Sequence, residues 1–294
     1  MTSIDRGSSL GRPPTFGRGV SVRIAQTAIM SIHRRWLSRP LPDRVAIYFH
    51  AVEPRQDKSF QRCIQFFLEN GYAFVDAAGL CAPGFSKRIF LSFDDNFRSW
   101  CRLLDTLDKL GVHVTFFVNT LPLRDIASAE TVKAFFNRIN YHGERVALSA
   151  EELLAIAEAG HAIGCHSHSH FVLSRLDRDS AEAEISGSKR FLDALLKRPV
   201  VDFAYPFGMR RHFSNGLIRF CIESGFRTIS TAISGLLYAE PRPTLIHRSS
   251  WDLDADLRYN VERLCIDGRI FERLTGRSAV LAPVSPARTE SAAD

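Results

Sequence analysis

The chain has 294 residues, of which 45% are hydrophobic and 24% charged. This is ordinary usage for a globular protein of one large or two smaller domains, and it excludes a disordered or collagen-like chain. The net charge is +6, but residues 1–44 hold eight Arg and two Asp, which leaves 30 basic and 30 acidic groups on the rest of the chain. Because the body is neutral, no nucleic-acid partner is expected.

Residues 1–43 are predicted to form a basic N-terminal arm. Residues 1–19 are rich in Gly, Pro, Ser and Arg and are expected to be poorly ordered. From Val20 to Trp36, apolar residues recur at near-helical spacing, which predicts an amphipathic helix. Two alternatives remain open for this helix, packing on the body or weak contact with a membrane surface.

The cellular location is predicted from three features. No run of about 18 apolar residues exists, so no transmembrane helix is expected. Arg23 interrupts the only apolar stretch that could serve as a secretory signal. Six Cys are scattered without a C-x-x-C pair, as in proteins with free thiols in a reducing compartment. A cytoplasmic location is therefore expected.

Residues 44–277 are predicted to form one α/β domain, followed by a flexible tail over residues 278–294. In chain order the predicted strands are Val45–Phe49, Ile89–Phe93, Val114–Val118, Ala162–Cys165, Val201–Ala204 and Thr228–Thr231. The predicted helices are Ser59–Asn70, Trp100–Leu110, Ser149–Ala159, Asp179–Leu196 and Ser214–Ser224, and four of them are followed by a glycine. This alternation predicts a parallel sheet or a (β/α) barrel, in which chemistry takes place at the carboxyl ends of the strands.

The first unusual strand end carries two adjacent carboxylates, Asp94 and Asp95. By itself, such a pair is explained without any function, as a helix N-cap or a turn, since Asp is common at both. The second strand end carries His166, His168 and His170. On a helical turn, the first and last of these would face the same side, which is the spacing of a paired imidazole metal site. The alternative is a polar helix start.

The third strand end runs from Phe203 to Gly208 through Tyr205, Pro206 and Phe207. It is either a tight turn with aromatic packing or a turn that presents a backbone N–H beside a metal. Two His and one carboxylate leave a position open for water in a catalytic zinc site. The second carboxylate is then free to act as a base, which completes a set for hydrolysing an amide.

At these residues the chain resembles the polysaccharide deacetylase family, also called the NodB-homology domain or carbohydrate esterase family 4. Ser92–Asp95 is similar to its T/S-F-D-D motif, His166–His170 to its H-S/T-x-x-H motif and Phe203–Gly208 to its F-A-Y-P-Y-G motif. Residues 47–52 and 114–118 resemble two further family strands. The resemblance covers about residues 44–250 in the family's order.

The resemblance implies a distorted (β/α)7 barrel, a single catalytic domain that removes acetyl groups from N-acetylated sugars. Carried over by residue, Asp94 is the general base. Asp95, His166 and His170 bind a divalent metal, for which zinc is expected. Ser167 supports the second motif by hydrogen bonding. Tyr205, Pro206 and Phe207 line the substrate site, and the backbone N–H of Phe207 stabilises the oxyanion.

The chain departs from the family pattern at three places. Asn96 follows the Asp pair where Gly is frequent, and Ala204 stands where longer forms of the third motif have an Arg that orients the base. Leu245-Ile246-His247 fits the family's L-x-H motif, so His247 is a candidate general acid, although it lies unusually near the third motif. Arg248 is alternatively an Arg that many shorter relatives carry at this place.

Two functions remain open. One is a carbohydrate N-deacetylase, a hydrolase of carbon–nitrogen bonds other than peptide bonds, acting on N-acetylglucosamine units of chitooligosaccharides or polysaccharides. The relatives include enzymes of nodulation factor and exopolysaccharide synthesis. The other is a non-catalytic sugar-binding relative, against which the intact Asp and His residues argue.

Overall fold

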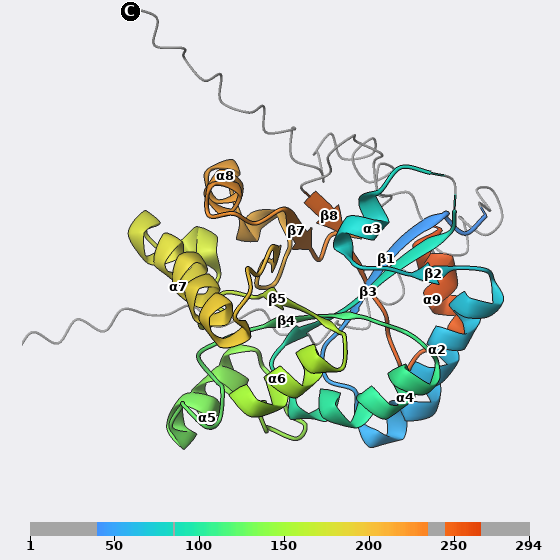
Figure 1. Cartoon of the computed structure of the whole chain (residues 1–294), viewed down its shortest axis with the longest axis horizontal. Helices are drawn as coiled ribbons and strands as arrows, with labels where there is room; N and C mark the ends of the chain where they lie inside the picture. The colour runs from blue at the N-terminus through green and yellow to red at the C-terminus, as the bar shows by residue number, and fades with distance from the viewer. Residues whose placement is uncertain (1–39, 85, 235–244, 266–294) are drawn as a thin grey trace, which may run out of the picture.

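The structure is a computed structural model that describes residues 40–84, 86–234 and 245–265 (Figure 1). Nine strands of the described chain form one sheet in which every pairing is parallel. They are β1 (Arg44–Phe49), β2 (Ala73–Phe74), β3 (Arg88–Asp95), β4 (Thr115–Val118), β5 (Ala162–Cys165), β6 (Asp202–Ala204), β7 (Thr228–Thr231), β8 (Leu245–His247) and β9 (Ser249–Ser250). The order is β8-β7-β6-β5-β4-β3-β1-β9, and β2 pairs with β3.

The sheet closes almost completely into a barrel. Strands β8 and β9 lie at its two edges, yet only Arg248 separates them in the sequence. One short segment therefore pairs with β7 before this residue and with β1 after it. The expected α/β barrel with a single domain is thus confirmed.

Helices surround the outside of the sheet (Figure 1). They are α2 (Asp57–Glu69), α3 (Ala77–Cys81), α4 (Leu104–Lys109), α5 (Ala129–Arg138), α6 (Ala150–Glu158), α7 (Arg178–Leu196), α8 (Asn215–Glu223) and α9 (Leu257–Leu264). Six of these helices have a side-chain cap at their amino end, from Asp76, Ser128, Ser149, Asp177, Ser214 and Asp256. Such caps satisfy backbone N–H groups that have no partner within the helix.

Two apolar clusters fill the space inside and outside the barrel. The large outer cluster packs the sheet against the helices, and the small inner cluster includes Phe90, Phe117, Ala204 and Ile246. Along β3, successive side chains alternate between the two, since strand side chains have a period of two. The same alternation directs Ser92 and Asp94 into the barrel. These two polar side chains follow Phe90 of the inner apolar cluster on the same face of β3.

The predicted strands agree with the structure to within about two residues, a margin typical of element boundaries. Gly71, Gly111, Gly160 and Gly225 all have positive φ, as expected of glycines that follow helices. The predicted helix Trp100–Leu110 is in part wrong, because residues Arg98–Leu103 form a 3-10 helix that precedes α4. The six Cys are free thiols, as predicted.

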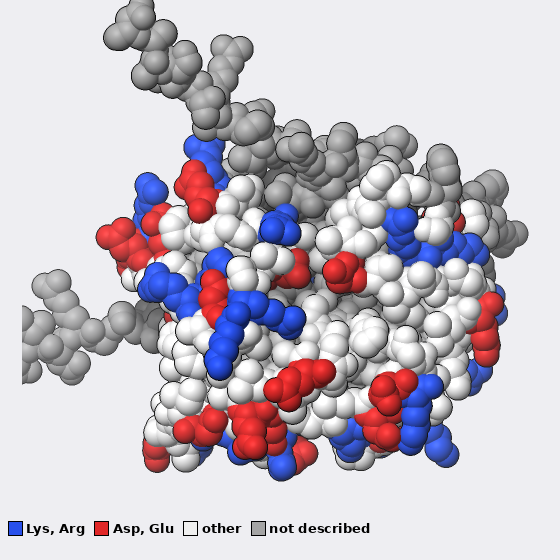
Figure 2. Space-filling view, in the orientation of Figure 1, with Lys and Arg blue, Asp and Glu red and all other residues white. Residues whose placement is uncertain are grey.

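Basic and acidic side chains are interspersed over the face of the molecule drawn in Figure 2, which agrees with the neutral charge balance of the body. Within the described ranges, no helix has the length and apolar character needed to cross a membrane. The predicted amphipathic helix from Val20 to Trp36, the arm and the tail lie outside the described residues. The domain boundaries therefore stay predictions.

Candidate active site

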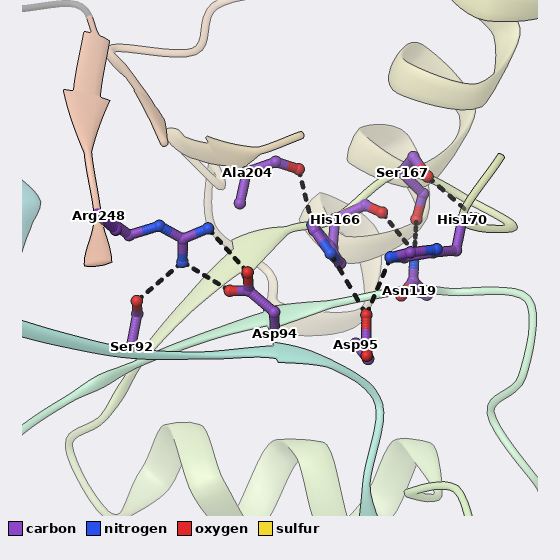
Figure 3. A network of polar contacts seen from close by, with 9 residues as sticks. All are labelled: Ser92, Asp94, Asp95, Asn119, His166, Ser167, His170, Ala204 and Arg248. Carbon is purple, nitrogen blue, oxygen red and sulfur yellow. Dashed lines mark hydrogen bonds and ion pairs between the residues drawn. The ribbon is translucent and has the colours of Figure 1, made fainter. Parts of the chain in front are cut away.

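Asp94 and Asp95 end strand β3, and their side chains face different partners (Figure 3). Asp95 has a φ of 86°, in the left-handed region that non-glycine residues rarely adopt. Its carbonyl accepts a hydrogen bond from the Asn119 N–H at 3.0 Å, which helps to hold this conformation. Neither residue caps a helix, because the strand continues through both. The N-cap alternative is therefore wrong.

The structure brings Asp95, His166 and His170 together as a buried group whose potential ligand atoms lie within 4.8 Å of one another. The Oδ1 atom of Asp95 is 3.0 Å from Nε2 of His170 and 3.5 Å from Nε2 of His166. Although these atoms are close, this buried oxygen accepts no well-formed hydrogen bond from the described residues. Two imidazole nitrogens and an unsatisfied carboxylate oxygen fit the ligand set of a divalent metal such as zinc.

The protonation states of this group also suit metal binding. Burial by itself would raise the pKa of Asp95, but the His170 and His166 side chains outweigh burial and hold the pKa well below its ordinary value. Burial lowers the pKa of His170, and the opposing attraction of Asp95 does not offset it. A carboxylate and a neutral imidazole are the forms in which these side chains ligate metals.

The second motif does not form the predicted helical turn. His166 lies just beyond β5, and the segment that follows has no helix up to Val172. Positive φ values at Ser167 (65°) and His170 (62°) fold the chain so that both imidazoles still reach Asp95. Ser167 supports this fold as predicted, because its Oγ accepts a hydrogen bond from the His170 N–H at 3.2 Å.

The two ring nitrogens of His166 have different partners. Its Nδ1 lies 2.7 Å from the backbone carbonyl of Ala204, which leaves Nε2 facing Asp95. A hydrogen bond of this kind fixes the ring orientation and the tautomer of a metal-binding imidazole. Ala204 thus serves the site through its backbone, while its side chain belongs to the inner apolar cluster.

Asp94 faces the barrel interior and forms a two-pronged ion pair with Arg248. The guanidinium donates to Oδ1 at 2.6 Å and to Oδ2 at 2.8 Å, and it also donates to the Ser92 hydroxyl at 2.8 Å. The Arg248 side chain is fully buried, and that of Asp94 is 5% exposed. Such paired contacts fix the plane of a carboxylate as well as its charge.

Aromatic rings enclose this ion pair. The guanidinium carbon lies 4.9 Å from the ring centre of Tyr48 and 5.0 Å from that of Phe117. Burial, followed by the charge of Asp94, raises the pKa of Tyr48 to about 12, so its hydroxyl stays neutral. The guanidinium of Arg248 is therefore held in two ways: aromatic rings contact its faces, and its N–H groups donate hydrogen bonds.

The third motif follows strand β6 as a turn. Tyr205 packs in the core, and its ring stacks on Phe213 with centroids 4.9 Å apart. Phe207 has a φ of 60°, and its ring centre lies 4.6 Å from that of His170. No acceptor for the Phe207 N–H occurs among the described residues. The turn therefore places a free backbone donor in a residue that contacts the candidate metal site.

His247 is held at the end of β8, where its Nδ1 lies 2.7 Å from the Thr231 hydroxyl. Adjacent residues of an extended chain point to opposite sides. Since Ile246 packs in the inner cluster and Arg248 contacts Asp94, this alternation directs His247 away from the barrel interior. A different histidine, His50, follows β1 and is exposed, and its charge contributes to lowering the pKa values of Asp95 and His170.

Sequence reasoning missed Asn119 and His50 as residues of the site, and it noted Asn96 only as a departure from the family pattern. Asn119 donates through Nδ2 to the carbonyls of His166 and Ser167, and Asn96 donates to the carbonyl of Asn119 at 2.9 Å. The side chain of Asn96 also accepts through its Oδ1 from the Leu148 N–H at 2.8 Å. One feature of the sequence could have indicated two of these residues. Asn119 directly follows β4 and His50 directly follows β1, so both lie at the carboxyl ends of strands, where the site is found.

Comparison with protein families gives a match over residues 83–219 to the model described as polysaccharide deacetylase. The matched segment contains the Asp pair, both metal-facing histidines and the third motif. The sequence has no match among curated proteins.

Three similar solved structures agree with this match. They are the Streptococcus pyogenes deacetylase PplD in complex with acetate (17% identity, TM-score 0.58, covering 71% of this chain and 92% of that one), the polysaccharide deacetylase BC0361 from Bacillus cereus (18%, 0.57, 75% and 68%) and IcaB from Ammonifex degensii (17%, 0.55, 75% and 96%). At these identities the likeness establishes a shared fold.

The barrel, the buried Asp-His-His group and the adjacent Asp–Arg pair together define a hydrolase site at the carboxyl end of a parallel barrel. The class is that of hydrolases acting on carbon–nitrogen bonds other than peptide bonds. Within this class, residues 83–219 match the polysaccharide deacetylase family, which confirms the resemblance inferred from the motifs.

Proposed function

We propose that this chain is a metal-dependent deacetylase that removes N-acetyl groups from oligo- or polysaccharides containing N-acetylglucosamine, with zinc as its metal. The observation that carries the proposal is the buried Asp95–His166–His170 group with Asp94 held beside it by Arg248. A chitooligosaccharide is the substrate class to test first. Acetate release that depends on added metal would support the proposal, and metal binding without acetate release would favour a sugar-binding relative.

Each residue of the site would have a separate role in amide hydrolysis. A bound divalent metal would supply Lewis acidity towards the acetyl carbonyl and its attacking water. Asp94, oriented by Arg248, would accept the proton of that water. The free N–H of Phe207 would donate to the oxyanion, as preorganised donors do in acyl transfer. Tyr205 and Pro206 would shape the turn that presents this donor to the substrate.

His166→Ala is expected to remove most of the bound metal and leave the fold intact. The variant deletes one of two imidazole ligands, and the remaining Asp95 and His170 supply too few protein ligands for a catalytic zinc site. Elemental analysis and circular dichroism check this prediction. His168→Ala is the matched control, because that ring contacts the Thr120 hydroxyl at 2.8 Å instead. Full metal occupancy in His166→Ala would contradict the assignment.

We propose that His50 donates the proton to the leaving amine, and that His247 is the less favoured candidate. His50→Ala is then expected to lower turnover by about 100-fold, the scale of losing a general acid. His247→Ala is expected to change turnover much less, because its ring is held by Thr231 and directed away from Asp94. Steady-state kinetics on metal-loaded variants decide between them. The opposite ranking would restore His247 as the acid.

The location of the enzyme and the role of its arm are also proposals. We propose a cytoplasmic enzyme whose basic arm, residues 1–43, makes weak contact with anionic lipid, since the arm holds nearly all of the net charge. Its substrate would then be an oligosaccharide or a lipid-linked sugar within the cell, as in nodulation factor or exopolysaccharide synthesis. Salt-sensitive co-sedimentation of the full chain with acidic vesicles tests the lipid contact.

A further inference from the structure

Two short 3-10 helices lie next to the candidate active site. Leu173–Arg175 follows β5 and the second motif, and Arg210–His212 follows β6 and the third motif. Because both segments come after the carboxyl ends of parallel strands, they lie on the same end of the barrel as the metal-facing histidines. The hydroxyl of Ser174 donates to the carbonyl of Arg211 at 2.7 Å and joins the two segments.

A chain of ring contacts connects these segments to the site. The His170 ring centre lies 4.6 Å from that of Phe207, which lies 5.4 Å from that of His212. Nε of Arg211 is 3.1 Å from Nε2 of His212. Burial, followed by the charges of Arg211 and Arg175, lowers the pKa of His212 to about 4, so this ring adds no charge of its own at neutral pH.

The segments carry three exposed arginines, Arg175, Arg210 and Arg211, which we call the arginine rim. In the described part of the chain, none of the three forms an ion pair. Many other arginines outside the barrel interior do pair with carboxylates, such as Arg55, Arg98, Arg102, Arg178 and Arg258. The rim is therefore a group of positive charges beside the site that no carboxylate of the described residues neutralises in an ion pair.

We propose that the arginine rim binds a phosphate group carried by the substrate, so that the enzyme prefers phosphate-linked N-acetylated sugars to neutral ones. This inference rests on the proposed deacetylase function. Guanidinium groups match phosphate with paired donors and always carry charge, whereas a neutral glycan offers no counter-charge. Sugar 1-phosphates, nucleotide-linked sugars and lipid pyrophosphate-linked sugars all share the required chemistry.

The first test compares substrates of equal sugar content. kcat/KM is measured for N-acetylglucosamine 1-phosphate, for UDP-N-acetylglucosamine, for a short-chain lipid pyrophosphate-linked N-acetylglucosamine and for the neutral methyl glycoside. We expect the phosphate-bearing sugars to be preferred by about tenfold or more, the scale of a charged hydrogen bond. The best of the three identifies the source of the phosphate. Equal values for neutral and phosphorylated sugars would overturn the inference.

The second test removes the charges. Arg210→Gln/Arg211→Gln is expected to reduce the preference for phosphate by about tenfold and so to remove most of it. The control, Arg62→Gln/Arg219→Gln, removes two exposed arginines from α2 and α8 and should retain the preference. An equal loss in the control would attribute the preference to overall charge and overturn the inference.

A binding measurement separates this inference from the proposed function. Titration calorimetry with pyrophosphate is expected to show binding to the wild-type chain and to the control variant, and at least about tenfold weaker binding to Arg210→Gln/Arg211→Gln. If no sugar releases acetate, the proposed function is wrong, but calorimetry still shows whether the arginine rim binds phosphate. Equal pyrophosphate affinity in all three proteins would show that the rim is not a phosphate site.

Discussion

Asp94→Asn is expected to reduce turnover by about 100-fold or more while the metal stays bound. The amide keeps the size of the carboxylate and can still accept from Arg248, so the barrel interior should remain packed. It cannot take a proton from water, and the metal-facing group of Asp95, His166 and His170 does not include this side chain. Acetate release by metal-loaded protein, measured beside metal content, checks both parts of the prediction.

Asp202→Asn is the matched control for this experiment. Asp202 is another carboxylate in the sheet, but it begins β6 and its Oδ1 accepts from the Thr228 hydroxyl at 2.5 Å. It therefore lies at the opposite end of the barrel from the site, and near-normal turnover is expected. If Asp94→Asn also turned over normally with its metal in place, the proposed base would be wrong.

Arg248→Met is expected to destabilise the fold by about 3–5 kcal/mol and to abolish most activity, because it leaves the Asp94 carboxylate buried without its partner. Urea unfolding of the wild-type and variant proteins measures the change in free energy. The Ser92 hydroxyl also loses its donor, which adds to the cost.

The double variant Asp94→Asn/Arg248→Met distinguishes a lost ion pair from lost packing. With both charges removed, much of the lost stability should return, since no buried charge remains unpaired. A double variant that is as unstable as Arg248→Met alone would show that the aromatic contacts of the guanidinium with Tyr48 and Phe117 dominate. Activity is expected to stay low in both variants.

The regular elements were predictable because their signals are local. Apolar runs gave the strands, and glycines marked the ends of the helices. The strand Ala162–Cys165, for example, has the same limits in sequence and structure. Helix α5 carries a serine N-cap and α9 an aspartate N-cap, which are also local signals, but these two helices were not identified.

The site was predictable in composition and less so in geometry. Asp95, His166 and His170 were grouped correctly, but the helical turn assumed for the histidines is absent, and positive φ values bring them together instead. The partner of Asp94 was left open, because Arg248 is 154 residues away and only the closure of the barrel brings them into contact. Periodicity carries no information on such a pairing, whereas tertiary structure determines it.

The single-residue join between β8 and β9 has a consequence for the smallest active piece of this protein. The segment that matches the family, residues 83–219, contains every candidate metal ligand, yet it lacks β1, both closing strands and Arg248. A fragment cut at those limits would carry the candidate metal ligands in an open sheet, and the proposed base, Asp94, would have lost its Arg248 partner. The proposed catalysis therefore depends on residues outside 83–219, and we expect a shortened enzyme to need at least residues 44–250.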